Sequence, residues 1–205
     1  MDFDAVLCDV DGVLRHWPSI EPIESAHGAT PGTLYAAAFA PHRVQPAITG
    51  AVTDEQWRAY VTADLVESGL SDATAESLVS AWSAMRPTTD ERVVAILRLA
   101  RAETLAVSLI SNATTRLESD LAEAGLSEFI DTAINTSRVG FAKPDPRIYA
   151  YAAQYVGAAP NRCLFVDDSL GNVEAARAAG MHAVHFRTVA DLESALGADR
   201  FSHHG

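Results

Sequence analysis

The stretch Ala5-Val6-Leu7-Cys8-Asp9-Val10-Asp11-Gly12-Val13-Leu14 places four apolar residues directly before two carboxylates. A short apolar run that ends in polar and glycine residues is typical of a buried strand in a parallel sheet. Open parallel sheets bind ligands beyond the carboxyl ends of their strands. Because Asp9 and Asp11 are separated by one residue, they can face one ligand, while Gly12 lets the chain turn away. This stretch therefore predicts both a strand and part of a site.

Four further apolar runs end in polar or glycine residues and alternate with helical patterns. Pro146 suits the first turn of a helix that reaches Tyr155, and Thr88 with Glu91 forms a capping-box pattern before another helix. Gly180 is typical of the position that follows a last helical turn. Strict alternation of strands and helices predicts an α/β fold, in which helices cover both faces of a parallel sheet. The four additional strands are expected at residues 105–110, 129–134, 163–166 and 183–186.

The segment between the first strand and the helix near residue 90 is far longer than the dozen or so residues that a crossover requires. Thr53 and Gln56 form a capping-box pattern that opens a helix to about residue 67. A second helix is expected to begin at Ser71 or Thr74 and to end at the Arg86-Pro87 pair. The segment is therefore interpreted as a mainly helical insertion.

We accordingly expect a core of residues 1–14 and 88–205 and an inserted helical cap of residues 15–87. A cap beside a sheet-edge site is a candidate lid. Its aromatic side chains could line a substrate pocket, but their helical spacing favours packing inside the cap. These side chains are Trp17, Tyr35, Phe39, Trp57, Tyr60 and Trp82.

The composition limits the classes of partner. The chain has 205 residues, of which 48% are hydrophobic and 20% charged, and 15 basic against 27 acidic side chains give a net charge of −12. This balance argues against binding to nucleic acid or to anionic membrane surfaces. Without a long apolar stretch or a basic secretory start, we expect a cytoplasmic protein, either a monomer or a homodimer. Cys8 and Cys163 lie far apart in apolar runs, which favours buried thiols over a disulfide or a zinc site.

Polar side chains follow three more of the expected strands. Ser111 and Asn112 end the second strand, and Asp167 with Asp168 end the fourth. Lys143 is the only lysine among the 15 basic residues, and it lies in a proline-fixed turn before a helix. All these groups fall at the edge of the sheet where ligands bind.

Electrostatics explains why these groups need one another. Adjacent carboxylates such as Asp167 and Asp168 are costly to hold close unless a cation shares them. A carboxylate that attacks a phosphate dianion meets repulsion on the order of 4 kcal/mol per charge pair at about 4 Å. Mg²⁺ and Lys143 would offset this repulsion, and Ser111 with Lys143 would hold the phosphoryl oxygens. Asp9 is then the nucleophile or a metal ligand, and Asp11 a proton donor and acceptor.

The four motifs together resemble those of the haloacid dehalogenase-like hydrolase superfamily. Their order along the chain is Asp9-Val10-Asp11-Gly12, Ser111-Asn112, Lys143-Pro144-Asp145-Pro146 and Asp167-Asp168-Ser169. The helical insertion resembles the C1-type cap of that superfamily, so the resemblance covers essentially the whole chain. It implies a Rossmann-like core, dependence on Mg²⁺ and an aspartyl-phosphate intermediate.

The resemblance also implies roles for individual residues. Asp9 is implied as nucleophile and Asp11 as general acid and base, with the main-chain carbonyl of Asp11 as a metal ligand. Asp168 is implied as a direct ligand, while Asp167 and Asn172 act through waters, although the choice between Asp167 and Asp168 stays open. The predicted metal residues are Asp9, Asp11, Asp167 and Asp168. The predicted catalytic and substrate-binding residues are Asp9, Asp11, Lys143, Ser111 and Asn112.

Members of this superfamily catalyse several reactions, and single residues of this chain distinguish some of them. True haloacid dehalogenases lack a carboxylate two residues after the nucleophile, whereas this chain has Asp11, which suits protonation of a leaving alkoxide. Phosphonate hydrolases use a cap lysine, and the cap here contains none. A phosphomutase would retain all four motifs, and a phosphate-binding signalling module would have its acid pair in another order. We therefore predict a phosphatase of a small phosphorylated metabolite, with a dehalogenase or phosphomutase as the alternative.

Arg15, His16 and Trp17 directly follow the first motif, at the junction between core and cap. They could contact the leaving group of a substrate, or they could be hinge residues with solvated ends.

Overall fold

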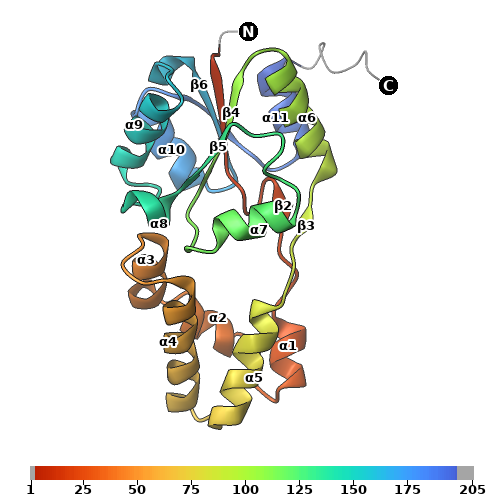
Figure 1. Cartoon of the computed structure of the whole chain (residues 1–205), viewed down its shortest axis with the longest axis vertical. Coiled ribbons are helices and arrows are strands. Elements are labelled where there is room, and N and C mark those ends of the chain that lie inside the picture. The colour runs from red at the N-terminus through yellow and green to blue at the C-terminus, as the bar shows by residue number, and fades with distance from the viewer. Residues whose placement is uncertain (1–2, 198–205) are drawn as a thin grey trace.

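The computed structural model describes residues 3–197, which form a layered α/β core and a helical lobe at one end of it (Figure 1). The strands are β1 Ala5–Cys8, β2 Arg15–His16, β3 Thr88–Thr89, β4 Ala106–Ser111, β5 Thr132–Asn135, β6 Cys163–Asp167 and β7 His182–His185. The α-helices are α1 Glu21–Ala26, α2 Thr33–Ala38, α3 Pro41–Ile48, α4 Asp54–Glu67, α5 Asp72–Ser83, α6 Glu91–Ala102, α7 Leu117–Glu123, α8 Thr136–Val139, α9 Pro146–Tyr155, α10 Leu170–Ala178 and α11 Val189–Leu196. A 3₁₀ turn, η1 Pro160–Arg162, precedes β6.

The central sheet is parallel and has the strand order β5-β4-β1-β6-β7. β1 lies in the middle, with Ala5 in register with Ala106 of β4 and with Cys163 of β6. The expected α/β fold is confirmed. The largest difference in a strand boundary is at β5, which begins at Thr132, because the buried Phe129 packs into the core before the strand starts.

The two faces of the sheet bury alternate residues of each strand. Val6 and Cys8 face the cluster that contains α6 and α11, whereas Ala5 and Leu7 face the cluster that contains α9 and α10. This two-residue alternation is the geometry of a strand covered on both sides. Figure 1 shows the two helix pairs on opposite sides of the strands. The core thus holds the carboxyl ends of the strands rigidly.

Helix starts follow local capping chemistry, with one correction. Thr53 caps α4 through the expected capping box with Gln56, and α9 begins at Pro146 as expected. The capping box expected at Thr88 is wrong. Thr88 lies in β3, and Asp90 caps α6 by accepting hydrogen bonds from the main chain of the first turn. The helix α5 also ends at Ser83, earlier than the proline that was expected to stop it.

Helices α1 to α5 form a lobe with its own hydrophobic cluster, which includes Leu34, Val61 and Leu78. Within it, α4 packs against α2, α3 and α5. The two chain passages into the lobe run side by side as β2 and β3, which pair antiparallel (Figure 1). Within residues 3–197, no helix combines the length and the apolar character needed to cross a membrane.

The aromatic residues of the lobe agree only in part with the expectation that they pack inside it, since Trp57 belongs to its hydrophobic cluster and Trp82 packs against that cluster. Only Trp57 is buried, with 5% of its surface exposed. Tyr35 and Phe39 are 59% and 42% exposed, and Trp17 and Tyr60 are exposed to a similar degree. Helical spacing therefore identified the cap helices but not the direction in which their aromatic faces point.

Candidate active site

Three strand ends of the core bring polar residues together. Asp9 directly follows β1, Ser111 is the last residue of β4, and Asp167 is the last residue of β6. The main-chain N–H of Asp9 donates to the carbonyl of Val166, which extends the ladder between β1 and β6 by one bond. All three side chains are buried. The parallel register of the sheet therefore fixes where these groups lie.

Lys143 reaches into this site from the loop before α9. Its ammonium nitrogen lies 2.8 Å from Asp9 Oδ1 and 2.7 Å from Asp167 Oδ2, and it also donates to the carbonyl of Ile110 at 3.0 Å. The side chain is 1% exposed. Burial works against the charged form, but the carboxylates of Asp9 and Asp167 outweigh it and raise the pKa of Lys143 above its usual value. The lysine is thus a fixed positive charge between two buried acids.

Asn112 holds the loop that carries this lysine. Its amide nitrogen donates to the carbonyl of Lys143, and its amide oxygen accepts from the N–H of the same residue, both at 2.8 Å. Both ends of the amide therefore bind the main chain of the lysine loop. We predicted Asn112 as a substrate-binding residue, and the structure places it both on the main chain of Lys143 and in the lining of the cavity described below.

Asp9, Asp167 and Asp168 form a cluster in which one carboxylate oxygen of each lies within 4.8 Å of the others. Asp167 is fully buried, and its carboxylate also accepts hydrogen bonds from the Ser169 N–H and the Asn172 amide. Burial raises the pKa of Asp9 to about 7, with Asp167 adding to the shift and Lys143 opposing it. Burial, and then Asp167, also raise the pKa of Asp168. Three acids thus share one ammonium, which leaves a negative charge for a cation to balance.

The position of the Asp168 carboxylate in this cluster depends on Gly12. Gly12 has a φ of +91°, and a Cβ built on it would lie 2.1 Å from Asp168 Oδ2. Only a residue without a side chain leaves that carboxylate in place. Clustered carboxylate oxygens are the donors that Mg²⁺ prefers. The residues present therefore fit a hard divalent cation. Because the bonds described above occupy Asp167, the more exposed Asp168 is the better placed to contact it directly.

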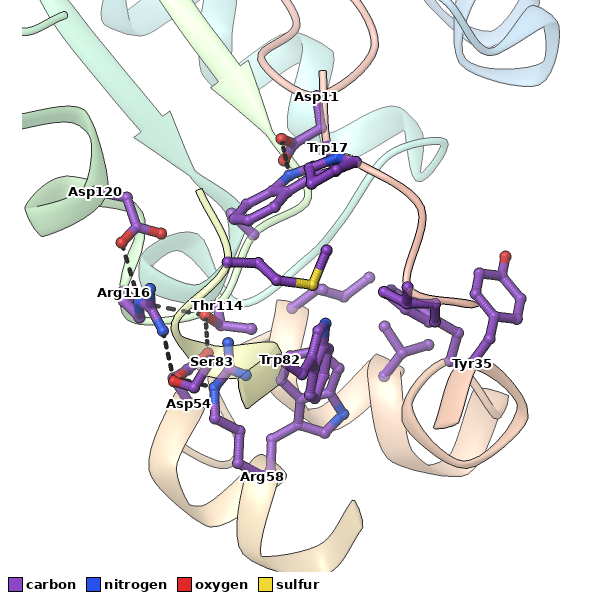
Figure 2. A pocket seen from close by; sticks show the side chains of 18 of the residues that line it. Asp11, Trp17, Tyr35, Asp54, Arg58, Trp82, Ser83, Thr114, Arg116 and Asp120 are labelled. Atoms are coloured by element: carbon purple, nitrogen blue, oxygen red, sulfur yellow. Dashed lines mark hydrogen bonds and ion pairs between the residues drawn. The ribbon is translucent and has the colours of Figure 1, made fainter. Parts of the chain in front are cut away.

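Asp11 is not part of this cluster. Its carboxylate accepts hydrogen bonds from Arg15 Nε and Trp17 Nε1, both at 2.7 Å, and Arg15 is almost entirely buried. Figure 2 shows Asp11 with the Trp17 indole beneath it, at the edge of a cavity. The sequence indicated that Arg15 and Trp17 lie at the junction of the two parts of the chain, but not that they bind this carboxylate.

A cavity of about 570 Å³ lies between the core and the helical lobe, with Asp11 in its lining. The lobe contacts the core around it. Thr114 donates to the carboxylate of Asp54 at 2.8 Å, and Arg116 donates to the hydroxyl of Ser83 at 2.9 Å. No sequence pattern singled out Asp54 or Thr114, because their contact spans 60 residues of chain. The cavity therefore lies between Asp11 and Asn112 of the core and a surface supplied by the lobe.

Comparisons with known proteins agree with this arrangement. Phosphatase MT3486 of Mycobacterium tuberculosis is 43% identical over 60 residues, which are 29% of this chain and 28% of that protein. Fructose-1-phosphate phosphatase YqaB of Escherichia coli is 37% identical over 70 residues, which are 34% of this chain and 37% of that protein. Both matches therefore span less than two thirds of the relative's length.

Solved structures share the fold over almost the whole chain. The family enzyme BT-2542 of Bacteroides thetaiotaomicron superposes with a TM-score of 0.74 at 17% identity, over 95% of this chain and 98% of that one. That enzyme has also been solved with magnesium and inorganic phosphate. L-2-haloacid dehalogenase of Xanthobacter autotrophicus gives a TM-score of 0.65 at 22% identity, over 95% and 83% of the two chains. The sequence model of one hydrolase family matches residues 3–180. The chain therefore belongs to the haloacid dehalogenase-like hydrolases.

Proposed function

We propose that the protein is a Mg²⁺-dependent phosphatase that hydrolyses the phosphate monoester of a small metabolite through an aspartyl-phosphate intermediate. The observation that carries this proposal is the position of Asp9, which touches the ammonium of Lys143 and lies within the three-carboxylate cluster. Asp11 stands apart from that cluster, at the cavity that would hold the leaving group. The proposed nucleophile, Asp9, and the proposed proton donor and acceptor, Asp11, thus lie in different parts of the site.

In the first step, a carboxylate oxygen of Asp9 forms a bond to phosphorus while the bond from phosphorus to the ester oxygen breaks. Protonated Asp11 gives its proton to the departing alkoxide, which leaves as an alcohol. Lys143 lies against the attacking oxygen and would bind the phosphoryl oxygens beside it, with the Ser111 hydroxyl as a second donor. Asn112 keeps the lysine in place.

In the second step, a water attacks phosphorus and gives a proton to the Asp11 carboxylate, while the bond between phosphorus and Asp9 breaks. Inorganic phosphate and the free Asp9 carboxylate result. The Nε of Arg15 lies 2.7 Å from the Asp11 carboxylate and helps to orient it at the cavity. Trp17 restricts the carboxylate to the cavity edge.

Asp9, Asp168 and the main-chain carbonyl of Asp11 are the groups that we assign to Mg²⁺, with Asp167 supporting them. A bound Mg²⁺ would supply positive charge to the phosphoryl oxygens and help to orient them for in-line attack. Asp11 also favours this reaction over release of halide from a 2-haloacid, because a leaving halide needs no proton.

The test uses the full chain with p-nitrophenyl phosphate, and the Asp9→Asn variant beside wild type. We expect activity with Mg²⁺, loss of activity in EDTA and recovery when Mg²⁺ is restored. Asp9→Asn should lower kcat by a factor on the order of 10³ or more, because it removes the nucleophile.

Asp72→Asn, an exposed acid in the first turn of α5, is the matched control and should retain wild-type activity. Turnover that survives Asp9→Asn or continues in EDTA would contradict the mechanism. Release of chloride from 2-chloropropionate without metal would support the dehalogenase instead.

A further inference from the structure

Five aromatic side chains line the cavity beside Asp11. The rings of Trp57 and Trp82 meet edge to face at 5.1 Å, and Phe39 lies 6.0 Å and 6.4 Å from them. Tyr35 continues the surface, stacked at 4.8 Å on Phe39. Large apolar side chains that remain exposed around a concave site are typical of a ligand-binding surface. The lobe therefore offers apolar surface to whatever the phosphoryl group is attached to.

Most of the polar side chains around the cavity are already paired with protein groups. The Glu24 carboxylate accepts from the main-chain N–H groups of Gly32 and Leu34, and the Arg116 guanidinium binds Asp120. Asp11 and Asp54 have the partners described above. A leaving group with many hydroxyls would find few free partners here, and each buried hydroxyl left unpaired costs about 1–3 kcal/mol. The lining therefore selects against a polyol and in favour of an apolar group.

Arg58 is the exception among the polar residues. Its Nε donates to Asp54 at 2.7 Å, and the centre of its guanidinium lies 4.4 Å from the ring centroid of Trp82. Its Nη1 is buried and has no hydrogen-bond partner among the described residues. A guanidinium keeps its charge, so an unused donor at this depth is costly unless an acceptor arrives. Figure 2 shows Arg58 beside Trp82, at the opposite end of the drawn cavity from Asp11.

Within the phosphatase function proposed above, we propose that the substrate's leaving group carries an aromatic ring with an oxygen acceptor at its far end. The ring would lie against Trp82 and its aromatic neighbours, with the ester oxygen at Asp11. The acceptor, of which a carboxylate is the strongest kind, would reach the guanidinium of Arg58 after a small movement of that side chain. Arg58 and Trp82 are then the residues that set specificity.

Synthetic esters of primary alcohols test this class, because their leaving alkoxides have similar basicity. For wild type with Mg²⁺, we expect kcat/KM for 2-naphthylmethyl phosphate to exceed that for glycerol 3-phosphate and fructose 1-phosphate by about tenfold or more, the effect of one or two aromatic contacts. We also expect 4-carboxybenzyl phosphate to exceed benzyl phosphate by about tenfold, the value of one charge-assisted hydrogen bond.

Two variants test separately the contact with the aromatic ring and the contact with the oxygen acceptor. Trp82→Leu should lower the ratio of kcat/KM for 2-naphthylmethyl phosphate over acetyl phosphate about tenfold. Arg58→Gln should bring the ratio for 4-carboxybenzyl over benzyl phosphate close to one. Thermal unfolding of each variant checks that it folds. Should Trp82→Leu fail to fold, Tyr35→Leu alters the same wall at an exposed position.

The lobe supplies matched controls outside the cavity. Arg43 also pairs with a carboxylate, that of Asp64, and also stacks on an aromatic ring, that of Tyr60. Arg43→Gln and Tyr60→Leu should leave both ratios unchanged. If wild type hydrolyses glycerol 3-phosphate or fructose 1-phosphate better than the aromatic esters, the inference fails while the phosphatase function stands. If neither the phosphate esters nor acetyl phosphate, an acyl phosphate, is hydrolysed in an Asp9-dependent way, the proposed function itself fails.

Discussion

Gly12 is the residue on which the position of Asp168 depends. A left-handed φ and a carboxylate at 2.1 Å from the site of a Cβ leave no room for a side chain. The sequence indicated Gly12 as a turn residue after the first strand. It did not indicate that the glycine leaves space for an acid that lies more than 150 residues further along the chain.

Gly12→Ala should therefore push the Asp168 carboxylate out of the cluster. We expect the affinity for Mg²⁺ to fall about tenfold or more, the usual effect of displacing a group that orients or supplies a ligand. Titration of phosphatase activity with Mg²⁺ measures this change. Gly28→Ala is the control, because Gly28 also has a positive φ but has open space around it. Equal loss of Mg²⁺ affinity in both variants would show that backbone strain, not contact with Asp168, is responsible.

The sequence was sufficient to predict which acids gather around Lys143. It was not sufficient to predict which side chain binds Asp11. Lys143 is the only lysine and lies in a rigid turn, so its position against Asp9 and Asp167 was predictable. Arg15 is one of many arginines in a chain that has one lysine, and its place after the first motif did not indicate Asp11 as its partner. It becomes significant only because the chain turns back at residues 11–15 and places its guanidinium on Asp11.

At the scale of elements, α3 is joined to α4 by a two-pronged ion pair. Arg43 donates from Nε and Nη2 to the two carboxylate oxygens of Asp64, at 2.7 Å and 2.6 Å. The hydrogen bonds from Arg43 hold the pKa of Asp64 below its usual value of 3.8. The ionised carboxylate therefore stabilises the folded state above pH 3.8, and this contribution is lost as the pH falls through the lower pKa of the folded protein.

Asp64→Asn should therefore destabilise the protein by about 1 kcal/mol at neutral pH, since both side chains are mostly buried. The difference from wild type should stay constant from pH 7 to about pH 5 and shrink below pH 4 as the wild-type carboxylate gains its proton. Urea unfolding at each pH measures it. A difference that persists unchanged at the lowest pH at which wild type folds would show that packing, and not charge, is lost.

Elements themselves were largely predictable because their signals are local. The capping box of α4 lies within four consecutive residues, and the structure contains it. The similar pattern at Thr88 failed because strand pairing with His16 takes that residue, and Asp90 is then the next side chain able to cap α6. A local sequence pattern carries no information about a competing partner such as His16, which lies 72 residues earlier.

At the scale of the whole molecule, the lobe is seated on the core through close backbone contacts. Thr136 donates to the carbonyl of Ile48 at 2.7 Å, next to Gly50, whose φ is positive. A Cβ on Gly50 would lie 1.9 Å from the carbonyl oxygen of Ser137. This contact, together with those of Asp54 and Ser83, holds the lobe against the core.

Gly50→Ala should therefore hold the lobe away from the core. We expect KM for the aromatic esters to rise, on the order of tenfold, because the cavity walls no longer meet the leaving group together. The radius of gyration from small-angle X-ray scattering should increase slightly. Gly69→Ala, at a positive φ with open surroundings, carries the same backbone cost without the contact and should keep the wild-type KM. An unchanged KM in Gly50→Ala would contradict this role.

The cavity lies beyond what the sequence could predict, since its walls come from segments that meet only after folding. The aromatic residues were visible in the sequence, but their spacing suggested the interior of the lobe. Their exposure follows from how α2, α4 and α5 pack, which leaves one edge of Phe39 and Tyr35 toward the core. The order of the strands determines where the core acids lie, whereas the packing of the lobe helices determines which aromatic side chains line the cavity.

The short ribbon formed by β2 and β3 brings the start and the end of the lobe next to each other, with Arg15 opposite Thr89. Neighbouring positions of an antiparallel pair are about 5 Å apart, a span that a tight turn or a whole folded unit can bridge equally well. Different helical inserts can therefore be grafted at this junction while the sheet and its acids stay as they are. A chimaera that carries a foreign lobe between residues 17 and 88 would keep the hydrolytic chemistry and acquire a different preference for the leaving alcohol.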